Sequence, residues 1–390
     1  MDFEFDEELQ AMRDMARNFA ERKIRPTMEE DEKEHRFRRE IVEDMARQGF
    51  FGCIAPEEFG GNDAGFLGAT VMCEEIARVS PSWGLPFNLQ MMGMQTVLMN
   101  YGNDEQKKAF YPGLVEAKTL GAFAITEPNS GSDVAGMGTT ATETEDGFLL
   151  NGTKTWISGI PVADVAVTFA YTDKSKKHRG ITAFLIEDMH AEGIEQIAIE
   201  TKLGLYCAPT GEITFQDAFV PKKNVVGELG QGFKICMNML DNTRLSSAAR
   251  AVGVGQALIE YCVQYANERT QFGQPIGKFQ MIQDQIADMY IEHEAAKLLV
   301  YRSAWEKDKQ WRETGKVFKT TLNTSVAKLY AAEAASHAAN LAMKIYGSYG
   351  FSTEYPIERY YRDSKTYQIV EGTSNIQKII IAGFALGYRK

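Results

Sequence analysis

Residues 371–375, with the sequence EGTSN, combine a carboxylate, a glycine and two hydroxyls directly before an apolar helical run over 376–386. A carboxylate in such a place can act as a base on a weakly acidic proton, such as the α-proton of a thioester. That chemistry needs a desolvated carboxylate with a raised pKa, together with donors for the developing enolate oxygen. The alternative interpretation is structural: Thr373 or Ser374 caps the helix and Glu371 is a solvated loop acid.

Two further segments carry polar and aromatic groups at the edge of a β-rich region. Residues 124–133 (AITEPNSGSD) offer hydroxyls such as Thr126, which suit the N5 and O4 atoms of a flavin, and Ser132, which suits a phosphate-rich ligand. A polar connection between strands is the plain alternative. Residues 151–158 (NGTKTWIS) predict a hairpin turn with Trp156 in the returning strand, where a Trp is usually core.

Two cationic motifs lie in helical patterns. Residues 241–244 (DNTR) are typical of a solvated i,i+3 ion pair, and residues 269–273 (RTQFG) are typical of a helix C-terminus with a favourable cation. Each arginine also presents a fork of fixed donors that suits an anionic ligand.

Together these segments resemble the acyl-CoA dehydrogenase family. The first family signature, hydroxyl-Glu-x-x-small-Gly-hydroxyl-Asp, matches residues 126–133, and the second matches most positions of residues 344–363. The resemblance covers nearly the whole chain. The sequence is most similar to the bacterial glutaryl-CoA and cyclohexanecarboxyl-CoA dehydrogenase branch, particularly in residues 242–249 and 351–357. One departure is Lys344, where the family has Gln or Glu; a lysine there can pair with pyrophosphate instead.

The resemblance implies a mechanism and a set of site residues. Glu371 is the catalytic base that removes the α-proton while hydride leaves Cβ for flavin N5, and its backbone N–H helps to bind the enolate oxygen. The expected FAD contacts are Phe123, Ile125, Thr126, Ser132, Trp156, Ile157, Ser158, Arg269, Phe272, Gln280, Lys344, Gly347, Ser348, Thr373 and Asn375. The expected acyl-CoA contacts are Ser132, Asp241, Arg244 and Gly372.

The resemblance also implies an assembly. A homotetramer is the usual state of the family, and Arg269 is expected to reach the FAD of a neighbouring subunit. The reduced flavin is expected to pass its electrons to an electron-transferring flavoprotein.

The elements that must position these residues follow a helical, β, helical order. Apolar residues recur at helical spacing in the first ~120 residues and again after 232, whereas the middle consists of short β-rich runs separated by Gly, Asn, Asp and Pro. We therefore expect an α+β fold with an N-terminal helical domain (1–120), a central β-barrel-like domain (121–231) and a C-terminal four-helix bundle (232–390). The last two descriptions follow the family resemblance.

Composition narrows the class of partner. The formal net charge of −11 argues against nucleic acid and anionic membranes, which need a basic surface. The five cysteines are scattered and the histidines are not clustered, so neither disulfides nor a metal site is expected. No basic-then-apolar leader and no run long enough for membrane insertion is present, so a cytoplasmic location is expected.

The acyl group is the least determined feature. Residues 79–99, which by resemblance line the acyl pocket, contain no charged side chain, whereas glutaryl-CoA enzymes place an arginine there for the distal carboxylate. With the adaptable Met91, Met92 and Met94 and the small Val370, this favours a short or alicyclic apolar group: cyclohexanecarboxyl-CoA first, then butyryl-CoA or a branched short chain. The methionines can equally be plain core. Rival functions are a glutaryl-CoA dehydrogenase, an acyl-CoA oxidase, which usually has a longer chain, and a non-catalytic flavin-binding scaffold, which would lack the base.

Overall fold

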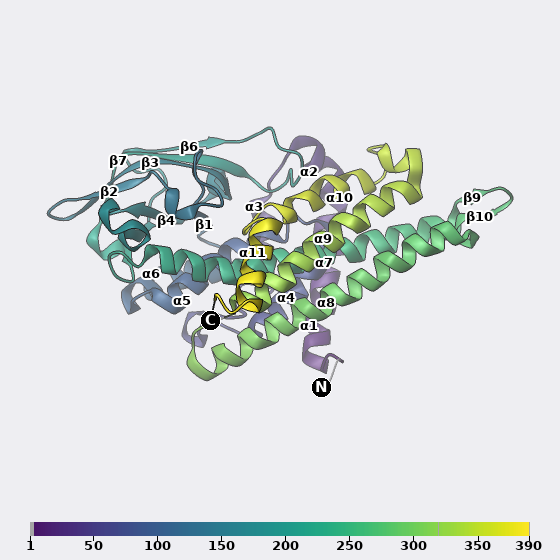
Figure 1. Ribbon diagram of the computed structural model, residues 1–390, viewed down its shortest axis with the longest axis horizontal. Helices are drawn as coiled ribbons and strands as arrows, with labels where there is room; N and C mark the ends of the chain where they lie inside the picture. The colour runs from purple at the N-terminus through teal and green to yellow at the C-terminus, as the bar shows by residue number, and fades with distance from the viewer. Residues whose placement is uncertain (1–3, 319, 390) are drawn as a thin grey trace.

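The computed structural model describes residues 4–318 and 320–389, in which helices surround one β-rich region (Figure 1). The α+β class and the helical, β, helical order are confirmed. Strand β1 begins at Gly121 and helix α7 at Gly232. The division into three domains at these residues stays a prediction.

The elements are as follows. The first helices are α1 (Glu7–Phe19), α2 (Met28–Glu34), α3 (Arg39–Arg47), α4 (Gly65–Val79), α5 (Thr96–Tyr101) and α6 (Asp104–Val115), with a π-helix, η4 (Phe87–Gln95), between α4 and α5. The main strands are β1 (Gly121–Ala124), β2 (Thr140–Glu143), β3 (Gly147–Ser158), β4 (Val165–Tyr171), β5 (Ile181–Ile186), β6 (Ile194–Ala198), β7 (Thr210–Pro221) and β8 (Val225–Val226). The last helices are α7 (Gly232–Glu268), α8 (Gln280–Thr314), α9 (Thr321–Tyr346), α10 (Ile357–Ser364) and α11 (Ser374–Ala385), and the hairpin of β9 (Thr270–Gln271) and β10 (Gln274–Pro275) joins α7 to α8.

The sheet runs in the order β6-β7-β3-β2-β4-β5-β8, and β1 pairs with β4 in parallel. Phe148 and Leu150 of β3 face the core because alternate side chains of a strand point to opposite faces. Among the described residues no pairing joins β6 to β8, so the sheet is open rather than a closed barrel.

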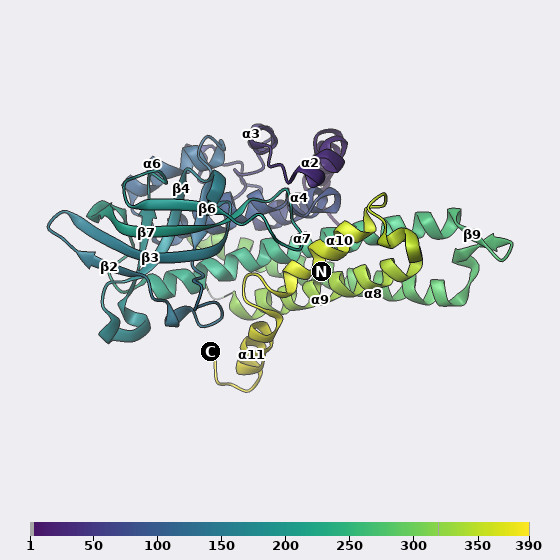
Figure 2. The ribbon, with the colours of Figure 1, turned by 90° about the horizontal axis from the view of Figure 1, so that it is seen from above.

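The C-terminal bundle is built on the long helices α7, α8 and α9, which lie side by side in both views (Figures 1 and 2). Alanines at helical spacing on α9, including Ala331, Ala335, Ala338 and Ala342, are buried and allow neighbouring helices to approach closely. Helices α10 and α11 pack against α9 of this bundle.

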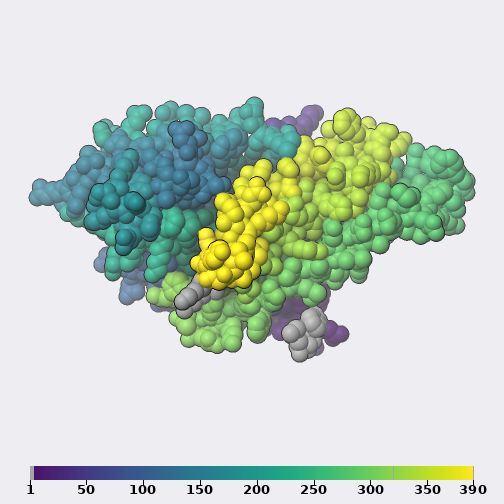
Figure 3. All heavy atoms as spheres, in the orientation of Figure 1, coloured from purple at the N-terminus to yellow at the C-terminus, as the bar shows by residue number. Residues whose placement is uncertain are grey.

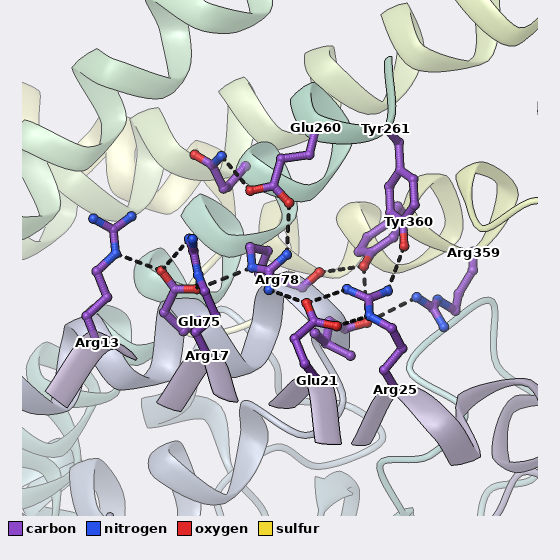
Figure 4. A network of polar contacts seen from close by, with 12 residues as sticks. Arg13, Arg17, Glu21, Arg25, Glu75, Arg78, Glu260, Tyr261, Arg359 and Tyr360 are labelled. Atoms are coloured by element: carbon purple, nitrogen blue, oxygen red, sulfur yellow. Dashed lines mark hydrogen bonds and ion pairs between the residues drawn. The ribbon is translucent and has the colours of Figure 1, made fainter. Parts of the chain in front are cut away.

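An ionic network with Glu75 and Arg78 buried at its centre ties the N-terminal helices to this bundle (Figure 4). The Glu75 carboxylate of α4 accepts from Arg13 at 2.8 Å and from Arg17 at 2.9 Å, both on α1. Arg78, also on α4, pairs with Glu260 of α7 at 2.8 Å and with Glu21. Removing Glu75 or Arg78 from this network would leave partner charges unsatisfied, which is unfavourable.

Helix η4 is the element that brings the N-terminal part against the sheet. All nine of its residues are buried, and π-helical segments are rare and often occur at functional sites. A Cβ added at Gly93 would come within 2.6 Å of the Phe123 ring, so the glycine allows β1 to pack directly on η4. This contact fixes the position of Asn88, the second residue of η4, beside the bundle.

Candidate active site

Glu371 lies in the short loop before α11, where the C-terminal segment crosses the boundary between the sheet and the bundle (Figure 3). Its carboxylate is half-buried and held at both oxygens. Asn88 Nδ2 donates to Oε1 at 2.9 Å, and Thr243 Oγ1 of α7 donates to Oε2 at 2.5 Å. Glu371 is therefore an oriented carboxylate rather than a solvated loop acid.

The backbone of this loop is held just as firmly. Glu371 and Gly372 both have positive φ, 57° and 87°, a left-handed conformation that costs energy at the non-glycine position. The Glu371 carbonyl accepts from Arg244 Nε and Gln377 Nε2, each at 3.1 Å. Lys328 Nζ donates to the Gly372 carbonyl at 2.8 Å, and burial lowers the pKa of Lys328 to about 8. Both carbonyls thus point into the bundle.

The Asp241–Arg244 pair exists as an i,i+3 ion pair, 2.5 Å between Arg244 Nη1 and Asp241 Oδ1, but it is buried rather than solvated. Thr321 Oγ1 donates to the other oxygen of Asp241, at 2.5 Å. Burial lowers the pKa of Arg244 despite these contacts. The guanidinium lies beneath the loop and supports the Glu371 carbonyl.

Trp156 departs from the usual position of a strand tryptophan. The pairing of β3 with β7 shifts register between Lys154 and Ile157, and within this irregularity Trp156 has φ 59° and a side chain that is 58% exposed. Bulges re-aim side chains in this way, often beside active sites. The Thr155 N–H donates to the Thr126 carbonyl at 2.8 Å, which joins the two sequence segments.

The exposed Trp156 ring and the half-buried Thr126 and Ser158 therefore form one surface that fits a planar ligand with polar edge atoms, as FAD has. Phe123 is half-buried and Ser132 exposed. The side chains of Ile125 and Ile157 are buried in the core of the sheet, so they leave only backbone groups for a ligand.

A buried ion pair stabilises the polar segment 124–133. Lys154 Nζ lies 2.7 Å from Glu127 Oε1, and the Thr139 hydroxyl donates to the same oxygen at 2.5 Å. Burial disfavours both charges. It lowers the pKa of Lys154. Burial also acts to raise the pKa of Glu127, but Lys154 and the hydrogen bonds keep that pKa below its usual value. The shape of this loop thus rests on one carboxylate and its donors.

The predicted FAD residues fall into two separate groups. The first group consists of the residues of the sheet, at one end of the molecule, together with Thr373 and Asn375 at the start of α11. Thr373 also caps this helix, because its hydroxyl accepts from the Ile376 N–H at 3.3 Å. The second group, at the far end of α7 and α9, consists of Arg269, Phe272, Gln280, Lys344, Gly347 and Ser348. Thr243 and Arg269 are separated by about 40 Å along α7, so one chain does not bring the two groups together.

At that far end Arg269 lies over the Tyr349 ring, 5.2 Å from its centroid, and Phe272 is almost fully exposed at the hairpin tip.

The structure adds residues that the sequence reasoning did not identify: Asn88, Thr243, Lys328 and Gln377. Thr243 lies inside the DNTR motif, and its position next to Arg244 was the one feature of the sequence that could have pointed to it. The other three come from distant segments and carry no local pattern.

In the described part of the chain all five cysteines are free and buried, and no cluster of candidate metal ligands occurs. None of the helices there is both long and apolar enough to cross a membrane.

Comparison with known proteins identifies the family. The acyl-CoA dehydrogenase N-terminal domain matches residues 6–118, the middle domain residues 122–218 and the C-terminal domain residues 230–386. Glutaryl-CoA dehydrogenase of Desulfococcus multivorans is 46% identical over 393 residues, covering 100% of this chain and 99% of that protein. The caffeyl-CoA reductase-Etf complex subunit CarC of Acetobacterium woodii is 39% identical over 383 residues, covering 98% and 99%.

A solved structure of a glutaryl-coenzyme A dehydrogenase glutaryl-CoA complex superimposes with a TM-score of 0.95 at 45% identity, covering 100% of this chain and 98% of that one. The chain therefore belongs to the acyl-CoA dehydrogenase family and is an FAD-dependent flavoprotein, an oxidoreductase acting on CH–CH bonds of acyl-CoA thioesters.

Proposed function

We propose that Glu371 is the base that removes the α-proton of a short-chain acyl-CoA thioester. The observation that carries this proposal is the carboxylate held at both oxygens by Asn88 and Thr243. FAD, when bound, supplies the acceptor for the hydride that leaves Cβ. The presence of an oriented base argues against a non-catalytic scaffold.

The loop backbone supports a second role. Within the described chain the Glu371 N–H donates no hydrogen bond, while the carbonyls of Glu371 and Gly372 are both held by the bundle. A fixed, free N–H beside the base can donate to the thioester oxygen as negative charge develops there. Arg244 then acts as a positioning residue for this loop, and Asp241 holds Arg244.

The flavin is held, in this proposal, by two chains. One chain surrounds the flavin ring system with the sheet residues from Phe123 to Ser158 and with Thr373 and Asn375. The neighbouring subunit provides the remaining FAD contacts, which are Arg269, Phe272, Gln280, Lys344, Gly347 and Ser348. Three exposed apolar side chains on α8, Ile291, Leu298 and Trp305, recur every seven residues and form a stripe suited to helix pairing. This supports a homotetramer or another assembly that buries α8.

We take glutaryl-CoA as the first candidate substrate, because a relative 46% identical is a glutaryl-CoA dehydrogenase. Cyclohexanecarboxyl-CoA remains the second, since residues 79–99 carry no charge. The apolar alternative loses part of its support because Met91, Met92 and Met94 are all packed in the core.

The proposed electron acceptor is an electron-transferring flavoprotein, because the name of the Acetobacterium relative places that protein in a complex with Etf. The proposed location is the cytoplasm. The test is a steady-state assay of the holoenzyme with an artificial electron acceptor on glutaryl-, butyryl-, isobutyryl- and cyclohexanecarboxyl-CoA. Turnover of at least one of them with bleaching of the flavin is expected. No turnover and no bleaching with any of the four would contradict the proposal.

A further inference from the structure

Arg250 is a buried cation without a carboxylate partner. Its side chain is 1% exposed, and among the described residues it forms no ion pair. Its Nε donates weakly to the Ser246 carbonyl at 3.4 Å, and its guanidinium lies over the Tyr367 ring, 5.5 Å from the centroid. Burying a charge without an opposite charge is unfavourable, so such a residue is expected to meet an anion in the working protein.

Its place on α7 relates it directly to the base. Thr243, Ser247 and Arg250 follow one another at i, i+4 and i+7 and therefore share one face of the helix. Thr243 holds the Glu371 carboxylate at one end of this stripe. An arginine side chain on a helix leans toward the N-terminus, which brings the guanidinium back by about one turn, or ~5 Å, toward Thr243.

The segment that packs against this face of α7 carries both contacts. Gly84 lies in the turn before η4, four residues ahead of Asn88. A Cβ added at Gly84 would lie 2.7 Å from Arg250 Cγ, so the glycine makes room for the arginine stem. One pair of residues, Asn88 and Thr243, therefore holds the base, and the next pair, Gly84 and Arg250, contains the cation.

Other polar groups near this cation also lack partners. The Ser247 hydroxyl lies between Thr243 and Arg250 on the stripe, and the Tyr367 hydroxyl belongs to the ring beneath the guanidinium; both are fully buried and neither has a hydrogen-bond partner in the described chain. Hydroxyls and a guanidinium can all donate. A group of buried donors with no carboxylate among them is suited to an anionic acceptor.

We infer that Arg250 binds the terminal carboxylate of a dicarboxylyl-CoA, with glutaryl-CoA as the fitting length. In an extended glutaryl group the carboxylate lies about 5 Å from the α-carbon, a distance of three carbon–carbon bonds and one carbon–oxygen bond. That is comparable with the ~5 Å that remains along α7 between Thr243 and a guanidinium leaning back by one turn. The inference rests on the proposed function, since it assumes that the acyl chain enters beside Glu371.

This assignment also explains why residues 79–99 carry no charge. The cation is supplied from α7, across the contact with Gly84, rather than from the pocket helix itself. The sequence of residues 79–99 taken alone therefore disfavours a dicarboxylate, whereas in the folded chain α7 supplies a cation for one.

The test compares glutaryl-CoA with pentanoyl-CoA, which has the same number of acyl carbons but no second carboxylate, on the holoenzyme. Wild type is expected to prefer glutaryl-CoA in kcat/KM. Arg250→Met, which keeps an unbranched stem against Gly84, is expected to lower kcat/KM for glutaryl-CoA about 100-fold or more, chiefly through KM, and to leave pentanoyl-CoA within about threefold. Arg250→Lys should restore part of the preference.

Arg359→Met is the matched control, because Arg359 is also buried and lies over a tyrosine ring, Tyr360, at 4.8 Å. It should leave the ratio between the two substrates unchanged. Binding without turnover is measured by isothermal titration calorimetry of both ligands on Glu371→Gln, with and without Arg250→Met; a selective loss of glutaryl-CoA binding is expected.

The outcomes separate the two proposals. Equal losses for both substrates in Arg250→Met would assign Arg250 a structural role and overturn the inference. A wild-type enzyme that oxidises pentanoyl-CoA but not glutaryl-CoA would overturn it while leaving Glu371 as the base. Failure of wild type to reduce its flavin with either substrate would overturn both.

Discussion

The side-chain amide of Asn88 donates to the carboxylate of Glu371 at 2.9 Å, across 283 positions of sequence. Thr243 donates to the other oxygen, so the carboxylate is held from two different elements, the π-helix η4 and the long helix α7. A base held in this way meets its proton in a fixed geometry without reorganisation. In the proposed function, this arrangement makes η4 part of the catalytic site.

Replacing Asn88 with Ala should lower kcat about 10- to 100-fold with little change in KM, because a hydrogen bond to a charged group contributes about 1.5–3 kcal/mol. The exposed Asn267 on α7 provides a control for the substitution itself. Stopped-flow flavin reduction with saturating acyl-CoA is the measurement. An unchanged reduction rate in Asn88→Ala would show that the amide does not orient the base.

Replacing Trp156 with Ala should weaken FAD binding about 5- to 10-fold, since the ring offers an aromatic surface to the flavin. Because the side chain is exposed in this chain, the stability of the apoprotein should change by no more than about 0.5 kcal/mol. FAD dissociation constants from flavin fluorescence would decide this. Phe219→Ala, which removes another exposed aromatic ring of the sheet, should retain wild-type FAD affinity.

Replacing Arg269 with Ala should reduce both FAD retention and assembly, as the residue is placed at a subunit boundary. Co-expression with Glu371→Gln gives the sharper readout: each variant is expected to be poorly active alone, while mixed assemblies regain activity because one site combines Glu371 of one chain with Arg269 of the other. Mixtures no more active than the separate variants would contradict a shared site.

Replacing Trp305 with Glu should dissociate the assembly, because a charge in the α8 stripe would be buried without a partner. Analytical ultracentrifugation should detect the smaller species. Leu203→Glu, at an equally exposed apolar position outside the stripe, is expected to sediment as wild type.

The network in Figure 4 predicts how stability depends on pH. The hydrogen bond from Arg25 is the main cause that lowers the pKa of Glu21 from 4.5 to about 2, and burial opposes it. The unfolded chain thus takes up a proton near pH 4.5, whereas the folded chain does so only near pH 2. The contribution is therefore complete above pH 4.5 and is lost as the pH falls toward 2.

Glu21→Gln should accordingly lower the free energy of unfolding by about 1 kcal/mol at pH 7, a value reduced by the partial exposure of the pair, and by less at pH 3. Urea unfolding at both pH values is the measurement, with Glu29→Gln on the exposed face of α2 as the control. An equal effect of Glu21→Gln at both pH values would exclude this linkage.

The sequence predicts the features that depend on local pattern. Helical and β periodicity give the order of the elements, and the motif around Glu371 indicates a base. Trp156 shows a first limit: its strand was predicted, but its exposed side chain depends on a register shift between β3 and β7. The open sheet, too, depends on pairings between distant strands.

Long-range contacts set the second limit. Arg250 lies on α7 and packs against Gly84, which is more than 150 residues earlier in the chain. The sequence of residues 79–99 alone therefore does not reveal the cation. Asn88 is similar: an amide in an apolar stretch has no pattern that points to Glu371. Only the packing of η4 on α7 brings these groups together.

The role of Glu371 is tested by anaerobic mixing of acyl-CoA with Glu371→Gln, a substitution that preserves size and shape but removes the base. FAD and acyl-CoA should still bind, and flavin reduction should slow by at least about 1,000-fold, so that the flavin stays yellow while wild type is bleached. Flavin reduction at the wild-type rate in this variant would contradict the assignment of Glu371 as the base.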